Sequence, residues 1–210
     1  MVGILTYLQY FLGRLLYRIR GHDAGQIVRT AAFRDLPQPN MKLEATECGP
    51  SGSLMLPYHT CLAADTKGNF PELHWTPPSK VEVKEYVLIS EDIDPPIPRF
   101  VVMHGLFYAI PASTTEALPD DVEQDENTKD HITQSGWRYV PNLLGTSYIG
   151  PAPPLGHGIH RYIFTIIALS EPLQFDRPDR VSKKQIKEAI VGKVIGWGQW
   201  IGHFERPWPN

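Results

Sequence analysis

The pattern of apolar and polar positions predicts one early helix, a long region of short strands and one late helix. Within residues 1–20 the apolar side chains recur at helical spacing, which predicts an amphipathic helix. From about residue 41 the apolar runs become short and are separated by Gly, Pro and Asn, as is typical of β-strands. The predicted strands cover residues 41–46, 54–58, 85–89, 106–110 and 162–169.

Four later segments carry more specific patterns. The run 162–169 is apolar on both faces, which predicts a central strand. Ser182 followed by Gln185 is a capping-box signal for a short helix. Residues 196–202 alternate glycine with bulky side chains, a pattern that indicates close backbone packing. Residues 116–130 are acidic and are predicted to form a solvated surface loop.

Length and composition favour one mostly β domain. A chain of 210 residues can bury a full core, and no linker interrupts it. Its 20 prolines are nearly twice the average share and favour loops and strand edges over helices. We therefore expect an amphipathic helix over residues 1–22 and a single domain over residues 23–210.

Charge and cysteine content limit the partners and the compartment. The net charge of −3, without a recurring Lys/Arg stripe, argues against a nucleic-acid partner. Cys48 and Cys61 are read as reduced thiols, because one disulfide would be an unusual sole crosslink for a domain of this size. No Asn-x-Ser/Thr acceptor occurs, which agrees with a cytoplasmic location.

The first 20 residues resemble neither a signal peptide nor a membrane span. Arg14, Arg18 and Arg20 follow the apolar run instead of preceding it, and Arg14 shortens the uncharged stretch below the roughly 20 residues that a spanning helix needs. We expect this helix to dock on the domain, with contact to a membrane surface or a dimer interface as the alternatives.

Two segments place ionisable residues at predicted strand ends. Asp92 and Asp94 follow the strand near residue 89 and precede Pro95 and Pro96, so a stiff turn would hold both carboxylates. The alternative is an ordinary solvated turn. His104 stands just before another apolar run, where it is either a pocket residue or a polar residue satisfied by its surroundings.

A third segment is the most specific. It reads Tyr148-Ile149-Gly150-Pro151-Ala152-Pro153-Pro154-Leu155-Gly156-His157-Gly158-Ile159-His160-Arg161-Tyr162. Taken in order, the three segments resemble the signatures of the phosphatidylethanolamine-binding protein family over roughly residues 41–208. The resemblance implies a mostly β Greek-key fold of two antiparallel sheets, here with an N-terminal amphipathic helix and a short C-terminal helix.

The resemblance also implies a small pocket for oxyanions such as phosphate or acetate. Carried over by position, the catalytic candidates are Asp92, His104 and His160, and the ligand-binding candidates are Asp94, Pro96, Tyr148, Gly150, Pro153, Pro154 and Tyr162. Imidazole N–H groups and tyrosyl hydroxyls can donate to an oxyanion, and Asp92 would fix the tautomer or charge of a histidine. Arg161 should point away, because side chains alternate along a strand. Gly105 stands where the family usually has a tryptophan, which predicts a wider or reshaped pocket mouth.

Two functions follow from the resemblance. Some fungal members are associated with joining two maleic anhydride units, and a dimerising cyclase of this kind would use His104 or His160 as base or donor. The alternative is a non-catalytic module that binds an anionic metabolite or phospholipid head group and modulates a kinase or protease. No cofactor is expected. A metal is not expected either, because His157 and His160 lack a nearby third ligand in sequence, although Asp92 could join them in the fold.

Overall fold

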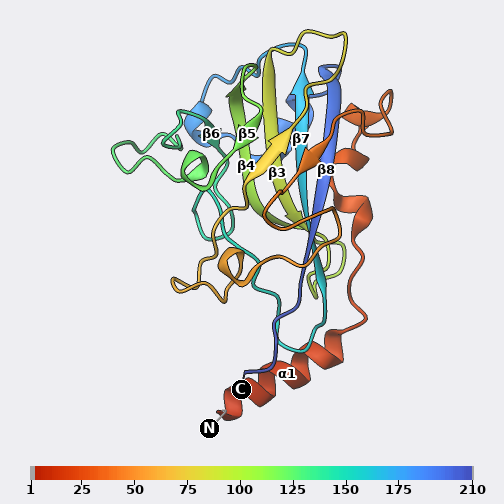
Figure 1. Ribbon diagram of the computed structural model, residues 1–210, viewed down its shortest axis with the longest axis vertical. Coiled ribbons are helices and arrows are strands. Elements are labelled where there is room, and N and C mark those ends of the chain that lie inside the picture. Colours follow the sequence, from red (N-terminus) through yellow and green to blue (C-terminus); the bar gives the residue numbers. More distant parts are fainter. Residues whose placement is uncertain (1–2, 210) are drawn as a thin grey trace.

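The computed structural model describes residues 3–209 and contains two antiparallel sheets (Figure 1). The three-stranded sheet has the order β1-β2-β5, and the five-stranded sheet has the order β6-β4-β3-β7-β8. The strands are β1 (Leu43–Glu44), β2 (Leu73–Trp75), β3 (Glu85–Asp92), β4 (Val102–Pro111), β5 (Glu116–Ala117), β6 (Arg138–Tyr139), β7 (His160–Leu169) and β8 (Val194–Phe204). The mostly β, two-sheet prediction is thereby confirmed.

The five-stranded sheet is covered on both faces, which explains why its inner strands are apolar throughout. Every residue of β3 is buried, and β7 lies between β3 and β8 as a central strand, as predicted. One core cluster fills the space between the sheets and includes Phe107, Phe164 and Trp200. A second cluster covers the opposite face with residues from α2 (Lys183–Ala189) and from the short helices η2 (Ile27–Arg29) and η3 (Ala31–Phe33).

The predicted elements differ from the structure at several places, and β2 and β6 lie outside every predicted strand. The strand predicted over 54–58 is wrong: Leu54 forms only an isolated bridge to His203, and Pro57–His59 is the 3-10 helix η4, since proline cannot donate to a ladder. The glycine-rich tail was predicted to pack closely but not to form β8. The acidic segment projects from the molecule, yet it also contains β5 and η5 (Pro119–Val122), with Ala117 and Val122 buried.

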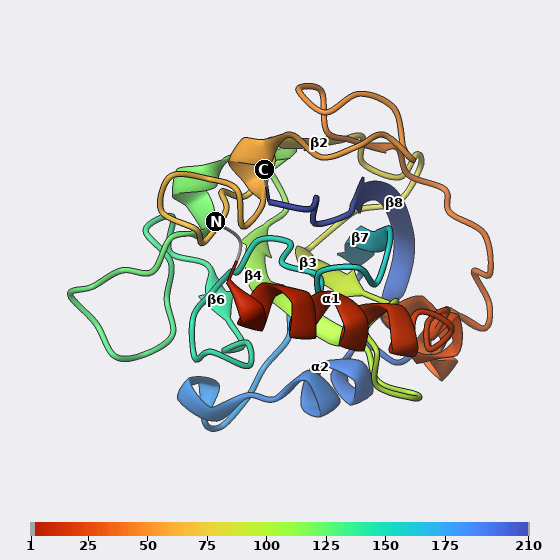
Figure 2. The same cartoon turned by 90° about the horizontal axis from the view of Figure 1, so that it is seen from below.

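Both predicted helices are present. Ser182 and Gln185 form the predicted capping box of α2. Helix α1 (Ile4–Leu16) lies across one end of the sheets, beside the C-terminal tail (Figures 1 and 2). In the described part of the chain, no helix is both long and apolar enough to cross a membrane. The remaining 3-10 helices are η1 (Asp23–Gly25) and η6 (Pro178–Arg180), and both cysteines are free.

Candidate functional site

Three strand ends bring the predicted catalytic residues together. In an antiparallel sheet the last residues of one strand lie beside the first residues of its neighbours. Asp92, at the end of β3, is therefore paired with Tyr162 near the start of β7 and with Val102 at the start of β4. His104 follows two residues later on β4, and its ring meets that of Tyr162 edge-on at 5.1 Å between centroids.

His104 is a buried, neutral imidazole with one free ring nitrogen. Its Nδ1 lies 2.7 Å from the carbonyl oxygen of Ile149, which can only accept, so Nδ1 carries the proton. Burial lowers the pKa of His104, and this effect outweighs the nearby charge of Asp92. The side chain therefore presents the lone pair of Nε2, which makes it an acceptor or a general base.

Two phenols complete the donor set. The hydroxyls of Tyr148 and Tyr162 are buried and have no hydrogen-bond partner in the structure. Burial raises the pKa of both phenols, and for Tyr162 the charge of Asp92 raises it further, so both stay protonated. Because an unpaired buried hydroxyl is costly, these two groups are suited to donate to a ligand oxygen.

A chain of hydrogen bonds runs from Asp92 to the backbone of α1. Asp92 Oδ2 lies 2.8 Å from His160 Nδ1, His160 Nε2 lies 2.7 Å from His157 Nδ1, and His157 Nε2 lies 3.0 Å from the carbonyl oxygen of Leu16. Both histidines are fully buried. The sequence named His157 only as a potential metal ligand, and its contact with Leu16 could not be read from residue spacing.

The proton count of this chain restricts the role of His160. Three hydrogen bonds need three protons, so Asp92, His160 and His157 together are electrically neutral wherever each proton resides. Neither ring nitrogen of His160 is left for a ligand. Its predicted role as catalytic base or donor therefore depends on breaking one of these bonds, whereas His104 needs no such change.

Asp94 has a structural role, because its carboxylate bonds to Arg161 and Gly21. Its carboxylate accepts from the Arg161 guanidinium at 2.8 Å and from the backbone N–H groups of Gly21 and Arg161, each at 2.9 Å. Although burial raises the pKa of Asp94, the bonds and charge of Arg161 outweigh it and hold that pKa below its usual value. The ion-pair role predicted for Arg161 is confirmed, and Asp94 faces this partner instead of the pocket.

The loop before β7 shapes the site by its backbone packing and offers few hydrogen-bond donors to a ligand. The N–H of Gly150 is donated to the carbonyl of Lys67, and a Cβ at Gly150 would lie 2.5 Å from the carbonyl oxygen of His59. Glycine is needed there for backbone packing rather than for an anion. Pro153 is buried, whereas Pro154 lies beside Pro96 in the wall of a cavity of about 270 Å³.

The absence of a tryptophan at Gly105 does not open the pocket. A Cβ on this residue would lie 2.9 Å from the Phe107 ring and 3.2 Å from the Tyr148 ring. These two rings occupy the space that a larger side chain would fill. The wider mouth expected from the sequence is therefore not found at Gly105.

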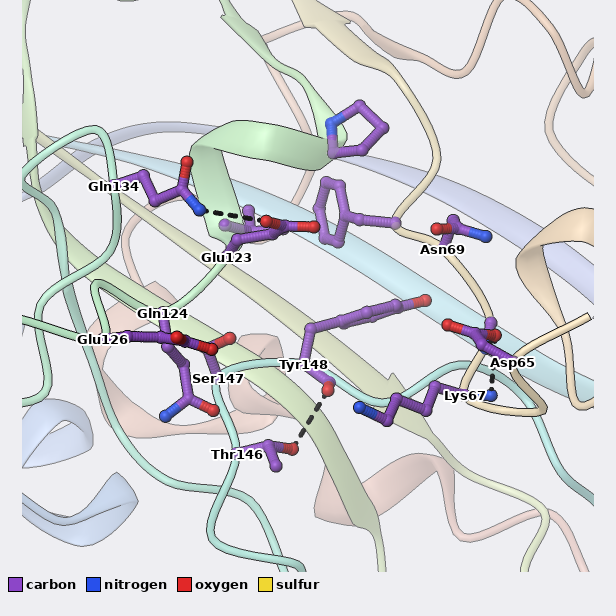
Figure 3. Close-up of a pocket in the computed structure, with 14 residues that line it drawn as sticks. Asp65, Lys67, Asn69, Glu123, Gln124, Glu126, Gln134, Thr146, Ser147 and Tyr148 are labelled. Atoms are coloured by element: carbon purple, nitrogen blue, oxygen red, sulfur yellow. Dashed lines mark hydrogen bonds between the residues drawn. The ribbon is translucent and has the colours of Figure 1, made fainter. Parts of the chain in front are cut away.

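A second hollow lies on the other side of Tyr148. Figure 3 shows Tyr148 between Asp65 and Lys67 on one side and Glu123 and Glu126 on the other, in a cavity of about 330 Å³. Its wall is mainly acidic and polar and contains none of the predicted catalytic residues. Although this cavity is the larger one, the chemistry described above is found around His104.

Comparison with known proteins gives consistent matches. A family model described as phosphatidylethanolamine-binding protein matches residues 45–205. A phomoidride biosynthesis cluster protein B from Talaromyces stipitatus is 40% identical over 209 residues, covering 98% of this chain and 84% of that protein. A protein of the same name from a fungal species is 37% identical over 210 residues, covering 99% of each.

Solved structures share the fold. A homologue of this family from Chlamydia trachomatis superposes with a TM-score of 0.62 at 23% identity and covers 81% of this chain and 100% of its own. The Escherichia coli protein YbcL superposes with a TM-score of 0.63 at 22% identity, covering 80% of this chain and 99% of its own. At these identities the likeness concerns the arrangement of the sheets.

Proposed function

Because this chain belongs to the phosphatidylethanolamine-binding protein family, we propose that it acts in fungal secondary metabolism as a dimerising cyclase that joins two maleic anhydride or dicarboxylate units. Two relatives that match nearly the whole chain are phomoidride biosynthesis cluster proteins. The observation that carries the proposal is the free Nε2 of neutral His104, whose ring meets that of Tyr162 edge-on, together with the unpaired buried hydroxyls of Tyr162 and Tyr148.

In this proposal His104 is the general base. Its Nε2 takes a proton from the carbon adjacent to one unsaturated anhydride, and the electrons of that C–H bond remain on the substrate as a delocalised carbanion. The hydroxyls of Tyr148 and Tyr162 donate to the oxygen on which the negative charge develops. The carbanion attacks the double bond of the second unit, forming a C–C bond, and the His104 imidazolium returns the proton to the carbon on which the negative charge then resides. A second deprotonation and addition of the same kind forms the second C–C bond and closes the ring.

The charge balance of the site favours this reaction over simple phosphate binding. His104 is neutral, both phenols are protonated, and the chain from Asp92 to His157 is neutral as a unit. A phosphate would be desolvated beside these groups without a positive charge to balance it, which is costly. A neutral anhydride carbonyl needs only the two hydroxyl donors, so the same argument favours the anhydride form of the substrate over the dicarboxylate. A module that binds anions without turnover is therefore the second candidate.

The test is incubation of the purified protein with a maleic anhydride monomer, with mass spectrometry to detect the dimer. We expect His104→Ala to lower the rate of dimer formation by at least about 100-fold. His74→Gln is the matched control, because His74 lies on β2 and is 39% exposed. Absence of dimer from the native protein, with carboxylate binding that His104→Ala weakens, would favour the binding module and overturn the cyclase proposal.

A further inference from the structure

Helix α1 turns its apolar stripe away from the domain. A surface helix normally buries this stripe against the core. Here six large apolar side chains share one face and have exposed fractions between 56% and 80%: Ile4, Leu5, Leu8, Phe11, Leu12 and Leu15. The opposite face, with Tyr10 and Gly13, contacts the domain. The helix is therefore docked, as expected, but by its less apolar side.

The docking contact explains this orientation. Gly13 is buried, and a Cβ there would lie 2.1 Å from the carbonyl oxygen of Leu155. On the loop side, Gly156 and Gly158 leave space for Tyr10 and Tyr17, with a Cβ at either position less than 3 Å from those rings. Close backbone contact of this kind requires small residues on both sides, so the bulky stripe must face outward.

The surroundings of the stripe are basic and aromatic. Residues 3–20 contain Arg14, Arg18 and Arg20 and no acidic residue, although the whole chain has a net charge of −3. Arg14 and Arg18 are exposed. Tyr7 packs beside Trp208 with ring centroids 5.1 Å apart, and both side chains remain partly exposed. Apolar stripes bordered by arginine and amphipathic aromatic residues are typical of helices that lie in a lipid interface.

We infer that α1 is a membrane-surface anchor that binds an anionic lipid bilayer through this stripe. The alternative occupant, a second copy of the chain, would bring like charges together, because α1 has no carboxylate to pair with the arginines. An anionic lipid surface would bury the apolar stripe and would also attract the arginines.

The anchor borders a cavity that also contains two of the ligand-binding candidates from the sequence, Pro96 and Pro154. Leu12, in the exposed stripe, also lines the cavity of about 270 Å³ that Leu16, Pro96, Pro154 and Arg206 border. Docking of α1 would therefore place this cavity beside the lipid. This consequence is independent of whether the site catalyses a reaction.

The test is sedimentation of the full chain with vesicles of phosphatidylcholine, alone or mixed with phosphatidylserine. We expect binding to the mixed vesicles, weakened at least about ten-fold by the double substitution Leu8→Asn and Leu15→Asn. Arg14→Gln and Arg18→Gln should each weaken it about five-fold and reduce its salt sensitivity. Leu143→Asn is the matched control, because Leu143 is 71% exposed but lies outside α1.

Three results would overturn the inference. The first is no binding to either kind of vesicle. The second is equal binding to both, which would remove the role of the arginines. The third is self-association in sedimentation equilibrium that the double substitution abolishes, because a second copy would then cover the stripe. Circular dichroism of each variant would show that the fold is retained.

Discussion

At the scale of single residues, the candidate site divides into groups that are free to bond to a ligand and groups whose hydrogen bonds are already made within the protein. The hydroxyls of Tyr148 and Tyr162 have no hydrogen-bond partner, and His104 uses only one of its two ring nitrogens, in the bond to the carbonyl of Ile149. By contrast, both ring nitrogens of His160 are engaged. Residue type suggested that the two histidines were equivalent, but of the two only His104 keeps a ring nitrogen without a hydrogen-bond partner.

His157 is a positioning residue, and two substitutions test this role. His157→Gln can accept from His160 with its carbonyl and donate to Leu16 with its amide, so both bonds survive. His157→Phe keeps a ring and removes both bonds. We expect the phenylalanine variant to lose about 1–3 kcal/mol of unfolding free energy, measured by urea titration, because His160 Nε2 and the Leu16 carbonyl lose their partner.

Nitrogen NMR of the histidine rings separates positioning from packing. The resonances of His160 should change in His157→Phe and stay close to native in His157→Gln. If the two variants gave the same His160 spectrum and the same stability, the hydrogen-bonded chain would have no role in holding that ring.

At the scale of elements, α1 and the loop before β7 form one unit. The helix contacts this loop through Gly13, and Arg20 donates to the carbonyl of His157. The loop in turn leads directly into His160 and Tyr162. The position of an exposed terminal helix is thereby coupled to the first residues of a central strand.

A single methyl group should separate α1 from the loop. Alanine is the better helix former by about 1 kcal/mol, so Gly13→Ala should stabilise an isolated helix. In the protein its Cβ would lie 2.1 Å from the Leu155 carbonyl oxygen, and backbone cannot yield as a flexible side chain can. We expect faster amide hydrogen exchange in residues 4–16 and 154–158. Gly3→Ala changes the N-cap of α1, but its Cβ meets nothing within 4 Å, so this control should leave exchange in residues 154–158 unchanged.

At the scale of the whole molecule, a buried neutral histidine links stability to pH. The pKa of His104 lies below its usual value of 6.5, so in acid the unfolded chain binds a proton that the folded chain does not. Stability therefore falls as the pH drops below about 6.5, with a slope from this group approaching about 1.4 kcal/mol per pH unit.

The substitution His104→Gln should remove this component. Urea unfolding of the native protein and the variant between pH 7.5 and 5.5, roughly the range over which histidine titrates, would show a shallower slope for the variant. Because His157 and His160 are present in both, the difference isolates His104. An unchanged slope in His104→Gln would show that folding does not shift the proton equilibrium of His104, contrary to the buried neutral imidazole described above.

The sequence by itself determined the inner strands and the capped late helix, because apolar runs and capping residues are local properties. Its resemblance to the family implied the two-sheet β architecture and the grouping of Asp92, His104 and Tyr162. Only the tertiary structure decided the reversed orientation of α1, the extended strand β8 and the partners of His157 and Asp94. Each of these depends on which distant backbone or side-chain atom comes within bonding or contact distance, and that is set by packing and register across the whole fold.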